Sequence, residues 1–120
     1  MNKRQRNYFK GLWAEYYAAF VLRLKGYKVL ARRYKTSAGE IDLVVCRKNT
    51  LVFTEVKFRG SLDQALESVT PRMKIRIEKA ALYFLSKHKA YESYDIRFDL
   101  VSVTFPFLLH HLDNAWRPAQ

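Results

Sequence analysis

The sequence predicts a single α/β domain over residues 1–120, in which helices flank a central mixed β-sheet in the order α-β-β-β-α-β-β. A segment with helical spacing opens the chain. Three segments of alternating apolar and polar residues follow it, and two more come after a second helical region. A length of 120 residues is typical of one domain with a sizeable core. No repeat, low-complexity tract or linker divides the chain.

The first predicted helix covers residues 8–25, with Gly26 as its stop. Large apolar residues recur there at intervals of three and four positions and are predicted to share one face: Trp13, Tyr16, Tyr17, Phe20 and Leu24. Glu15 falls in a different row, among small and apolar residues, so its carboxylate is expected in an apolar setting. Glu15 is therefore predicted either to form a buried salt bridge or to serve a function.

Helical spacing and the alternation of apolar and polar residues also predict the other elements. Strands are predicted at 27–34, 40–46, 51–58, 94–100 and 107–112, a short helix from Leu62, and a longer helix at 71–89. Ser61 and Gln64 resemble a capping box, and Thr70-Pro71 is typical of a helix start. The longer helix is predicted to turn its apolar residues to the core: Met73, Ile77, Ala81, Phe84 and Leu85.

The polar segment 47–50 has the length of a hairpin connection. A turn centred on its middle residues would place Asp42 across from Glu55, and Glu40 across from Lys57. Because side chains alternate along a strand, the two acids Asp42 and Glu55 would then share one face of the sheet. The opposite face of the strand at 40–46 would carry Ile41, Leu43 and Val45.

The charge balance of 22 Lys+Arg against 11 Asp+Glu gives a formal net charge of +11 and points to a polyanionic partner. Residues 1–7 are predicted to form a flexible basic N-terminus. The longest apolar run, residues 16–22, is far shorter than a membrane-spanning helix, and no secretory signal is recognised, so we expect no membrane partner and a cytoplasmic location. The single cysteine, Cys46, is expected to be a small buried thiol.

Asp42, Glu55 and Lys57 have the residue types that metal-dependent phosphodiester cleavage requires. Mg²⁺ prefers carboxylate oxygens and retains water ligands, and a nearby lysine can orient the attacking water or stabilise charge on the phosphate. The alternative is a solvated sheet face with a salt bridge between Glu40 and Lys57 and no functional meaning. The three histidines lack the spacing of a metal site, and Asp99 is expected to form an ion pair with Arg97 or Arg59.

Several segments together resemble the bacterial YraN-like family of small proteins proposed to be endonucleases. They are Gly11-x-x-x-Glu15-x-x-Ala18, Gly39-Glu40-Ile41-Asp42-Leu43-Val44, Leu51-Val52-Phe53-Thr54-Glu55-Val56-Lys57-x-Arg59, Lys74 and Arg97-Phe98-Asp99. That family is similar to the PD-(D/E)xK restriction endonuclease-like superfamily and, within it, to the archaeal Holliday-junction resolvases. The chain departs from the family pattern at Ala14, where glycine is usual, and at Arg33, where asparagine is usual.

The resemblance implies a restriction endonuclease-like fold and a Mg²⁺-dependent, structure-selective DNA endonuclease of repair or recombination, with Mn²⁺ as another usable metal. It implies that Asp42 and Glu55 are metal ligands, that Lys57 is the catalytic lysine and that Glu15 is an additional catalytic acid. Basic residues are expected to contact nucleic acid: Arg32, Arg33, Lys35, Arg59 and Lys74.

Two other functions stay open at this point. The chain would otherwise be a non-catalytic nucleic-acid-binding or adaptor protein that retains the nuclease fold, or a basic protein that docks on another protein. No recognition helix or zinc finger is evident in the sequence, so we expect recognition of branched or otherwise structured DNA rather than of base sequence. Whether the chain acts as a homodimer is also open.

Overall fold

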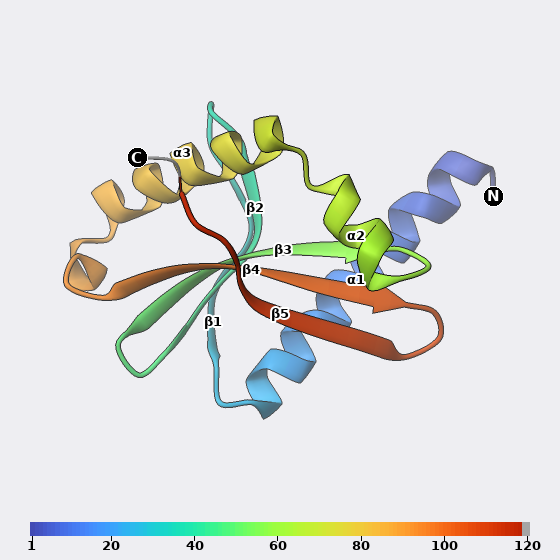
Figure 1. Ribbon diagram of the computed structural model, residues 1–120, viewed down its shortest axis with the longest axis horizontal. Helices are drawn as coiled ribbons and strands as arrows, with labels where there is room; N and C mark the ends of the chain where they lie inside the picture. Colours follow the sequence, from blue (N-terminus) through green and yellow to red (C-terminus); the bar gives the residue numbers. More distant parts are fainter. Residues whose placement is uncertain (119–120) are drawn as a thin grey trace.

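The computed structural model describes residues 1–118 and shows a mixed α/β fold (Figure 1). Its elements are α1 (Lys3–Leu24), β1 (Lys28–Lys35), β2 (Glu40–Arg47), β3 (Thr50–Phe58), α2 (Leu62–Ser68), α3 (Pro71–Lys87), the 3₁₀ turn η1 (Lys89–Tyr91), β4 (Asp95–Thr104) and β5 (Leu108–Trp116). This order confirms the predicted α-β-β-β-α-β-β arrangement. The last two strands are longer than predicted because they pair with each other from Thr104 and Leu108 at the hairpin to Phe98 and Trp116.

The five strands lie in one sheet in the order β1-β2-β3-β4-β5. Neighbouring strands are antiparallel except β3 and β4, which run parallel and are joined through α2 and α3. Figure 1 shows α3 above the sheet and α1 on the opposite side, so each face of the sheet is covered by a helix. The sheet thereby buries both faces, which explains why β3 is buried from Leu51 through Val56.

The apolar face predicted for α1 is wrong in part. Tyr16, Phe20 and Leu24 are more than half exposed, whereas Ala14, Ala18, Ala19 and Leu22 form the buried face of the helix. Small side chains let the helix backbone approach the sheet closely, and that packing outweighs burial of the larger rings. Glu15 lies next to this face, with a side chain only 13% exposed, as its position in the helical row predicted.

Helix α1 also begins earlier than predicted, at Lys3 instead of residue 8. Asn2 caps it, because its side chain accepts a hydrogen bond from the Gln5 N–H while the Gln5 side chain accepts one from the Asn2 N–H. Residues 3–7 are therefore helical, and the flexibility predicted for residues 1–7 stays a prediction. Among residues 1–118, no helix has both the length and the apolar character needed to span a membrane.

Helices α2 and α3 begin where the capping patterns predicted. The hydroxyl oxygens of Ser61 and Thr70 accept hydrogen bonds from the N–H groups of Gln64 and Met73, and Pro71 occupies the first turn of α3. The α3 face that packs on the sheet contains Ile77, Ala80, Ala81 and Phe84. Helix α3 thus covers the ends of β2 and β3 that carry the acidic residues Asp42 and Glu55.

Candidate active site

The β2–β3 hairpin has the predicted register. Leu43 pairs with Thr54, and the ladder continues regularly to Arg47 and Thr50 beside the turn. The ladder does not extend to Asp42 and Glu55. Instead, Oδ2 of Asp42 accepts a hydrogen bond of 2.8 Å from the N–H of Val56. The carboxylate therefore enters the gap where the two strands separate, one residue beyond the last backbone pair.

The backbone of β1 is also irregular opposite Asp42. Arg33 has a φ of 53°, a left-handed conformation that is uncommon for residues other than glycine and asparagine. Beyond this point Ile41 packs in the cluster under α3, not with Leu43 and Val45 in the cluster under α1. The predicted grouping of these three residues on one face is wrong, and the left-handed backbone of Arg33, opposite Asp42, is the local irregularity that accounts for the interrupted alternation.

Four acidic residues line one open cleft of about 340 Å³ between the strand ends and α3. They are Glu15 of α1, Glu40 and Asp42 of β2, and Glu55 of β3. Glu55 is only 7% exposed. The solvated sheet face that was the alternative interpretation is thus wrong for Glu55, which lies in the interior beside other carboxylates.

Burial and mutual repulsion change the acidity of two of these groups. Burial, followed by the neighbouring Asp42 carboxylate, raises the pKa of Glu55 well above its usual range, and Lys57 offsets this only in part. Burial, and then Asp42, raises the pKa of Glu15 to about 7, although Arg33 acts to lower it. Without a further cation, the folded protein therefore favours the protonated form of Glu55, and of Glu15 below about pH 7.

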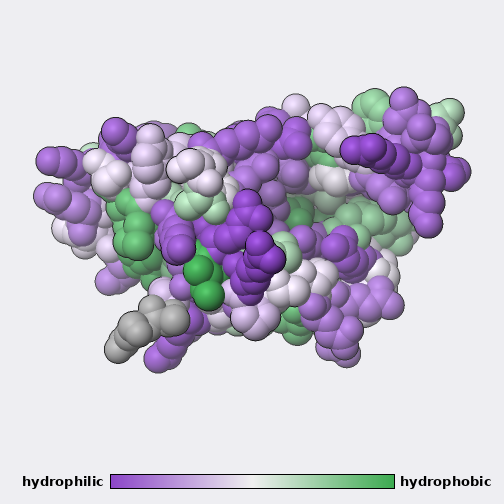
Figure 2. Space-filling view, turned by 90° about the horizontal axis from the view of Figure 1, so that it is seen from above, coloured by the Kyte–Doolittle hydropathy of each residue, from purple (hydrophilic) through white to green (hydrophobic). Residues whose placement is uncertain are grey.

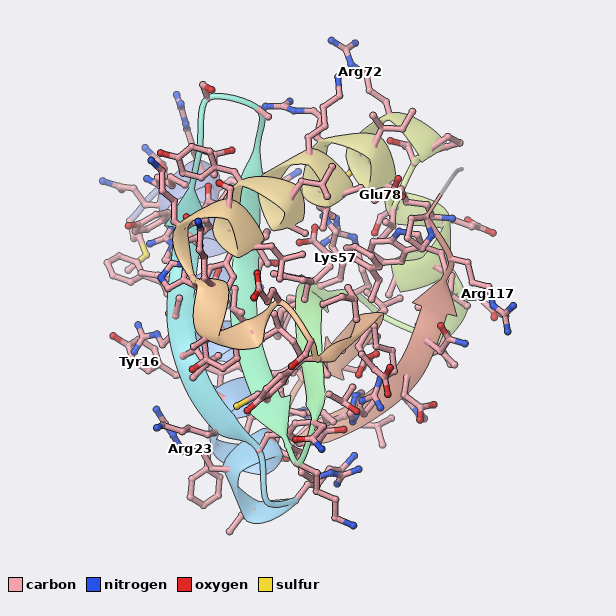
Figure 3. The ribbon with its side chains drawn as sticks, turned by 90° about the vertical axis from the view of Figure 1, so that its left-hand side faces the viewer. Tyr16, Arg23, Lys57, Arg72, Glu78 and Arg117 are labelled. Carbon is pink, nitrogen blue, oxygen red and sulfur yellow. The ribbon has the colours of Figure 1, made fainter. Side chains whose placement is uncertain are left out.

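Two cations border the acids. Nζ of Lys57 lies 3.2 Å from Oε2 of Glu55, and the Lys57 side chain is 16% exposed; Figure 3 shows Lys57 below α3 in that view. Nε of Arg33 lies 3.6 Å from Oε1 of Glu15 and 3.7 Å from Oε1 of Glu40, but the buried Oε1 of Glu15 has no hydrogen-bond partner among the residues described. The salt bridge between Glu40 and Lys57 that belongs to the alternative interpretation is not formed, since each of the two pairs elsewhere.

Helix α3 closes the cleft with two residues that were predicted only as core residues, Met73 and Ile77, and with Arg76, which the sequence patterns did not single out. Met73, Arg76 and Ile77 line it, and Nε of Arg76 donates to the carbonyl of Ala38 at 3.1 Å. A Cβ atom on Gly39 would lie 2.9 Å from the carbonyl oxygen of Arg76, so only glycine fits this close approach. The Gly39 position in the sequence motif is the one signal that could have indicated the contact.

The five residues predicted to contact nucleic acid are dispersed. Arg33 lines the acid cleft, whereas Arg59 lines a separate groove beside Lys57. The guanidinium of Arg32 stacks over the Tyr16 ring at 4.0 Å, and Nζ of Lys74 lies 5.9 Å from the Trp116 ring centroid. Lys35 is exposed at the end of β1. The structure therefore brings only Arg33 and Arg59 next to the acids and Lys57.

No group of three or more His, Cys, Asp or Glu side chains within residues 1–118 is arranged to hold a metal ion. Mg²⁺ commonly uses only one or two protein carboxylates and keeps several waters, so a pair of acids is chemically sufficient. The pair formed by Asp42 and Glu55 fits that requirement, because Glu55 is buried beside Asp42 and its ionised form lacks full compensation until a cation binds.

A second polar cluster lies on the α1 side of the sheet. The fully buried carboxylate of Asp99 accepts two hydrogen bonds from Arg97, at 2.8 and 2.9 Å, one from Nε2 of His111 at 2.7 Å and one from the N–H of Asn114 at 2.9 Å. Arg97 also donates to the Tyr27 hydroxyl at 2.6 Å. The predicted ion pair of Asp99 is therefore made with Arg97, and its satisfied hydrogen bonds indicate a structural role.

The sequence is similar to one protein family over most of its length. The profile of the uncharacterised protein family UPF0102 matches residues 14–103. A UPF0102 protein of Parvibaculum lavamentivorans is 49% identical over 111 residues, covering 92% of this chain and 84% of that protein. A UPF0102 protein of Bartonella bacilliformis is 38% identical over 117 residues, covering 98% of this chain and 96% of that protein.

Proposed function

This chain belongs to the uncharacterised protein family UPF0102, and we propose that it is a Mg²⁺-dependent, structure-selective DNA endonuclease of repair or recombination. The family is the YraN-like family predicted from the sequence. One observation carries the proposal: Asp42, Glu55 and Glu15 converge in a single cleft, with Lys57 3.2 Å from Glu55. A protein that only binds a polyanion gains nothing from buried acids in its binding surface.

Asp42 and Glu55 would hold the ion, and Mn²⁺ would serve in place of Mg²⁺ because it accepts the same oxygen ligands. The unpartnered Oε1 of Glu15 marks a carboxyl oxygen that is free to accept another ligand, and the raised pKa of Glu55 marks a carboxyl group whose ionised form a divalent cation would stabilise. Bound there, the ion would act as a Lewis acid on the scissile phosphate and increase the acidity of a bound water.

The chain's own residues would position the reactants. The Val56 N–H donates a hydrogen bond to the Asp42 carboxylate. Strand β3 therefore fixes the orientation of this carboxylate, including that of its second oxygen. Lys57 would orient the attacking water or stabilise charge that develops on the phosphate, because its ammonium is held at the acid pair. Glu15 would add a third carboxyl group from α1.

Selection of DNA by shape fits the distribution of charge. Contacts between cations and phosphates position nucleic acid without reading bases, and the sequence shows no evident recognition helix or zinc finger. We therefore propose branched, flapped or otherwise structured DNA as the substrate, and the cytoplasm as the place of action. The competing possibility is a non-catalytic nucleic-acid-binding or adaptor protein with the same fold.

The test compares wild type with Lys57→Ala, Glu55→Gln and the control Lys79→Ala, which removes an exposed lysine on α3. Initial cleavage rates are measured on branched, flapped, nicked and single-stranded DNA with Mg²⁺ or Mn²⁺, and DNA affinities are measured in the absence of divalent metal. Lys57→Ala and Glu55→Gln should lower the rate by at least 10²-fold, consistent with the loss of one preorganised group, with little loss of affinity.

Cleavage that is equal in all four proteins would have to come from a contaminant or another site and would contradict the proposal. Absence of cleavage on every DNA tested, with tight binding preserved, would instead favour the non-catalytic module. An equal loss of rate in Lys79→Ala would show that net charge, and not the position of Lys57, determines the rate.

A further inference from the structure

A second groove, separate from the acid cleft, is lined in part by Lys57. It has a volume of about 450 Å³ and is lined by α1 and the end of β3: Asn7, Lys10, Gly11, Val56, Lys57, Phe58 and Arg59. Three of these residues are cations and none is an acid, whereas the neighbouring cleft holds four acids. Lys57 therefore stands at the boundary between an acidic and a basic compartment.

The charges of Lys10 and Arg59 are not neutralised within residues 1–118, because neither forms a salt bridge there. Nζ of Lys10 lies 5.9 Å from the Phe58 ring centroid, and Nη1 of Arg59 donates to the carbonyl of Phe58. Both contacts are with the groove's own wall and leave N–H donors free for a ligand. A row of unpaired cations beside Lys57 favours a polyanion.

Gly11 has no packing reason to be glycine. Glycine inside a helix lowers its stability relative to alanine, yet a Cβ atom built on Gly11 meets nothing within 4 Å. Helix α1 is thus less stable with glycine at position 11 than it would be with alanine, although alanine would fit there. A ligand that passes close to the backbone of α1 would account for this choice, since a side chain would project into the groove.

The basic character continues along the free end of α1. Residues 1–10 are all exposed, and this part of the helix extends beyond the sheet (Figure 1). It carries Lys3, Arg4 and Arg6 and no acid before Glu15. Figure 2 shows this end as a largely hydrophilic projection at the upper right. The groove and the projecting helix together form one basic track that ends at Lys57.

We propose that the groove at Gly11 holds the phosphodiester backbone of a DNA strand on one side of the scissile phosphate. Lys10 and Arg59 contact its phosphate oxygens, Asn7 donates to the backbone, and the absence of a side chain at Gly11 lets the strand lie against α1. The proposal rests on the proposed function in taking DNA as the substrate, but it concerns binding and not the acid cleft.

The experiment measures the affinity of the full chain for a fluorescent four-way DNA junction by anisotropy in EDTA, where no cleavage occurs. Gly11→Ala should leave the melting temperature unchanged or raise it while weakening binding several-fold, and Gly11→Leu should weaken binding at least tenfold. Ser86→Leu, at an exposed position of α3, is the matched control and should bind as wild type. The melting curve of each variant verifies folding.

A second pair of variants tests the cations. Lys10→Ala/Arg59→Ala should flatten the slope of log K against log salt concentration by about 1.8, which corresponds to two phosphate contacts on duplex DNA. The control Lys79→Ala/Lys89→Ala makes the same change in net charge at exposed sites and should retain the wild-type slope. Equal slopes in both double variants, or wild-type affinity in folded Gly11→Leu, would overturn the groove as the binding site.

The outcomes separate the two proposals. Loss of binding in Gly11→Leu, with no cleavage by wild type on any DNA, supports the groove and contradicts the nuclease. Cleavage by wild type that Gly11→Leu retains with wild-type affinity contradicts the groove alone. A junction that does not bind wild type at all, or that polyglutamate displaces as effectively as unlabelled DNA, overturns the groove as a DNA site.

Discussion

The Asp42 carboxylate accepts a hydrogen bond of 2.8 Å from the N–H of Val56, the residue between Glu55 and Lys57. A side chain of β2 thereby takes the place of a backbone acceptor for β3. This contact ties the spacing of the acid pair to the hairpin itself, so that the position of the acids does not depend on a flexible loop.

Asp42→Asn is expected to preserve this hydrogen bond through the amide oxygen while removing a charge that repels Glu55. Stability in EDTA should therefore be unchanged or higher. Millimolar Mg²⁺ should stabilise wild type by about 1 to 3 kcal/mol if its concentration exceeds the dissociation constant 10- to 100-fold, but should not stabilise the variant. Calorimetry with and without metal measures both effects. A clear loss of melting temperature in EDTA would identify Asp42 as a structural residue instead.

The raised pKa values of Glu15 and Glu55 predict that the metal-free protein loses stability as the pH rises. Above the ordinary glutamate pKa of 4.5 the unfolded chain has released these protons while the folded chain retains them, up to about pH 7 for Glu15. Between pH 5 and 8 the free energy of unfolding should fall by several kcal/mol, at most about 1.4 kcal/mol per pH unit for each acid that stays protonated. Urea denaturation in EDTA measures it, and Glu15→Gln/Glu55→Gln should give a flatter profile. A rise in stability over this range would be inconsistent with burial of the acids.

Replacing Asp99 should be among the most destabilising changes in this chain. Asp99→Asn removes the charge that Arg97 and His111 surround and should cost about 3 to 5 kcal/mol, because a partly buried cation is left without its partner. Equilibrium denaturation at pH 7 tests this, with Asp95→Asn, at an exposed site at the start of β4, as the control. Equal stability of the two variants would mean that the cluster contributes little.

The same carboxylate predicts a loss of stability in acid. Burial acts to raise the pKa of Asp99, but hydrogen bonds from His111, Arg97 and the Asn114 N–H together hold it below its ordinary value of 3.8. Its contribution is therefore present above about pH 4 and is lost as the pH falls through the lower folded-state pKa. Acid titration followed by circular dichroism should show a transition that Asp99→Asn lacks. If Asp99→Asn unfolds over the same pH range as wild type, the Asp99 carboxylate is not the cause of the acid transition.

Two glycines should respond in opposite ways to the same substitution. Gly39→Ala places a Cβ atom 2.9 Å from the Arg76 carbonyl oxygen and should cost about 1 to 3 kcal/mol as α3 moves away from the β1–β2 turn. Gly11→Ala meets no atom and should gain up to about 1 kcal/mol. Thermal melts of the two variants, side by side, provide the comparison. A change of melting temperature with the same sign in both variants would show that the structure accommodates a Cβ atom at Gly39 without loss of stability.

Local patterns were sufficient to predict the β2–β3 register and the helix starts at Ser61 and Thr70, because turn length and capping involve residues close in sequence. They failed for Tyr16 and Phe20, since the face that α1 buries is decided by the shape of the sheet below it. They also failed at Ile41, where the left-handed backbone of Arg33 on the neighbouring strand interrupts the alternation.

In the candidate site, too, the residues close together in sequence could be predicted and the contacts between distant segments could not. Asp42, Glu55 and Lys57 lie on one hairpin, and their motif is readable along the chain. The contact between Arg76 of α3 and the turn at Gly39, in contrast, joins segments distant in sequence. Only the glycine itself indicates this contact in the sequence.

The parallel pairing of β3 with β4 has a consequence for the route by which the chain folds. It joins residues as distant as Thr50 and Asp95, whereas the acid-bearing hairpin closes through a turn between Arg47 and Thr50. Closing the larger loop costs more chain entropy, so the hairpin is expected to form first and the β3–β4 pair to limit the folding rate. In stopped-flow refolding, Val101→Ala in β4 should then slow refolding, whereas an equally destabilising change in the α1 face, such as Leu22→Ala, should mainly speed unfolding.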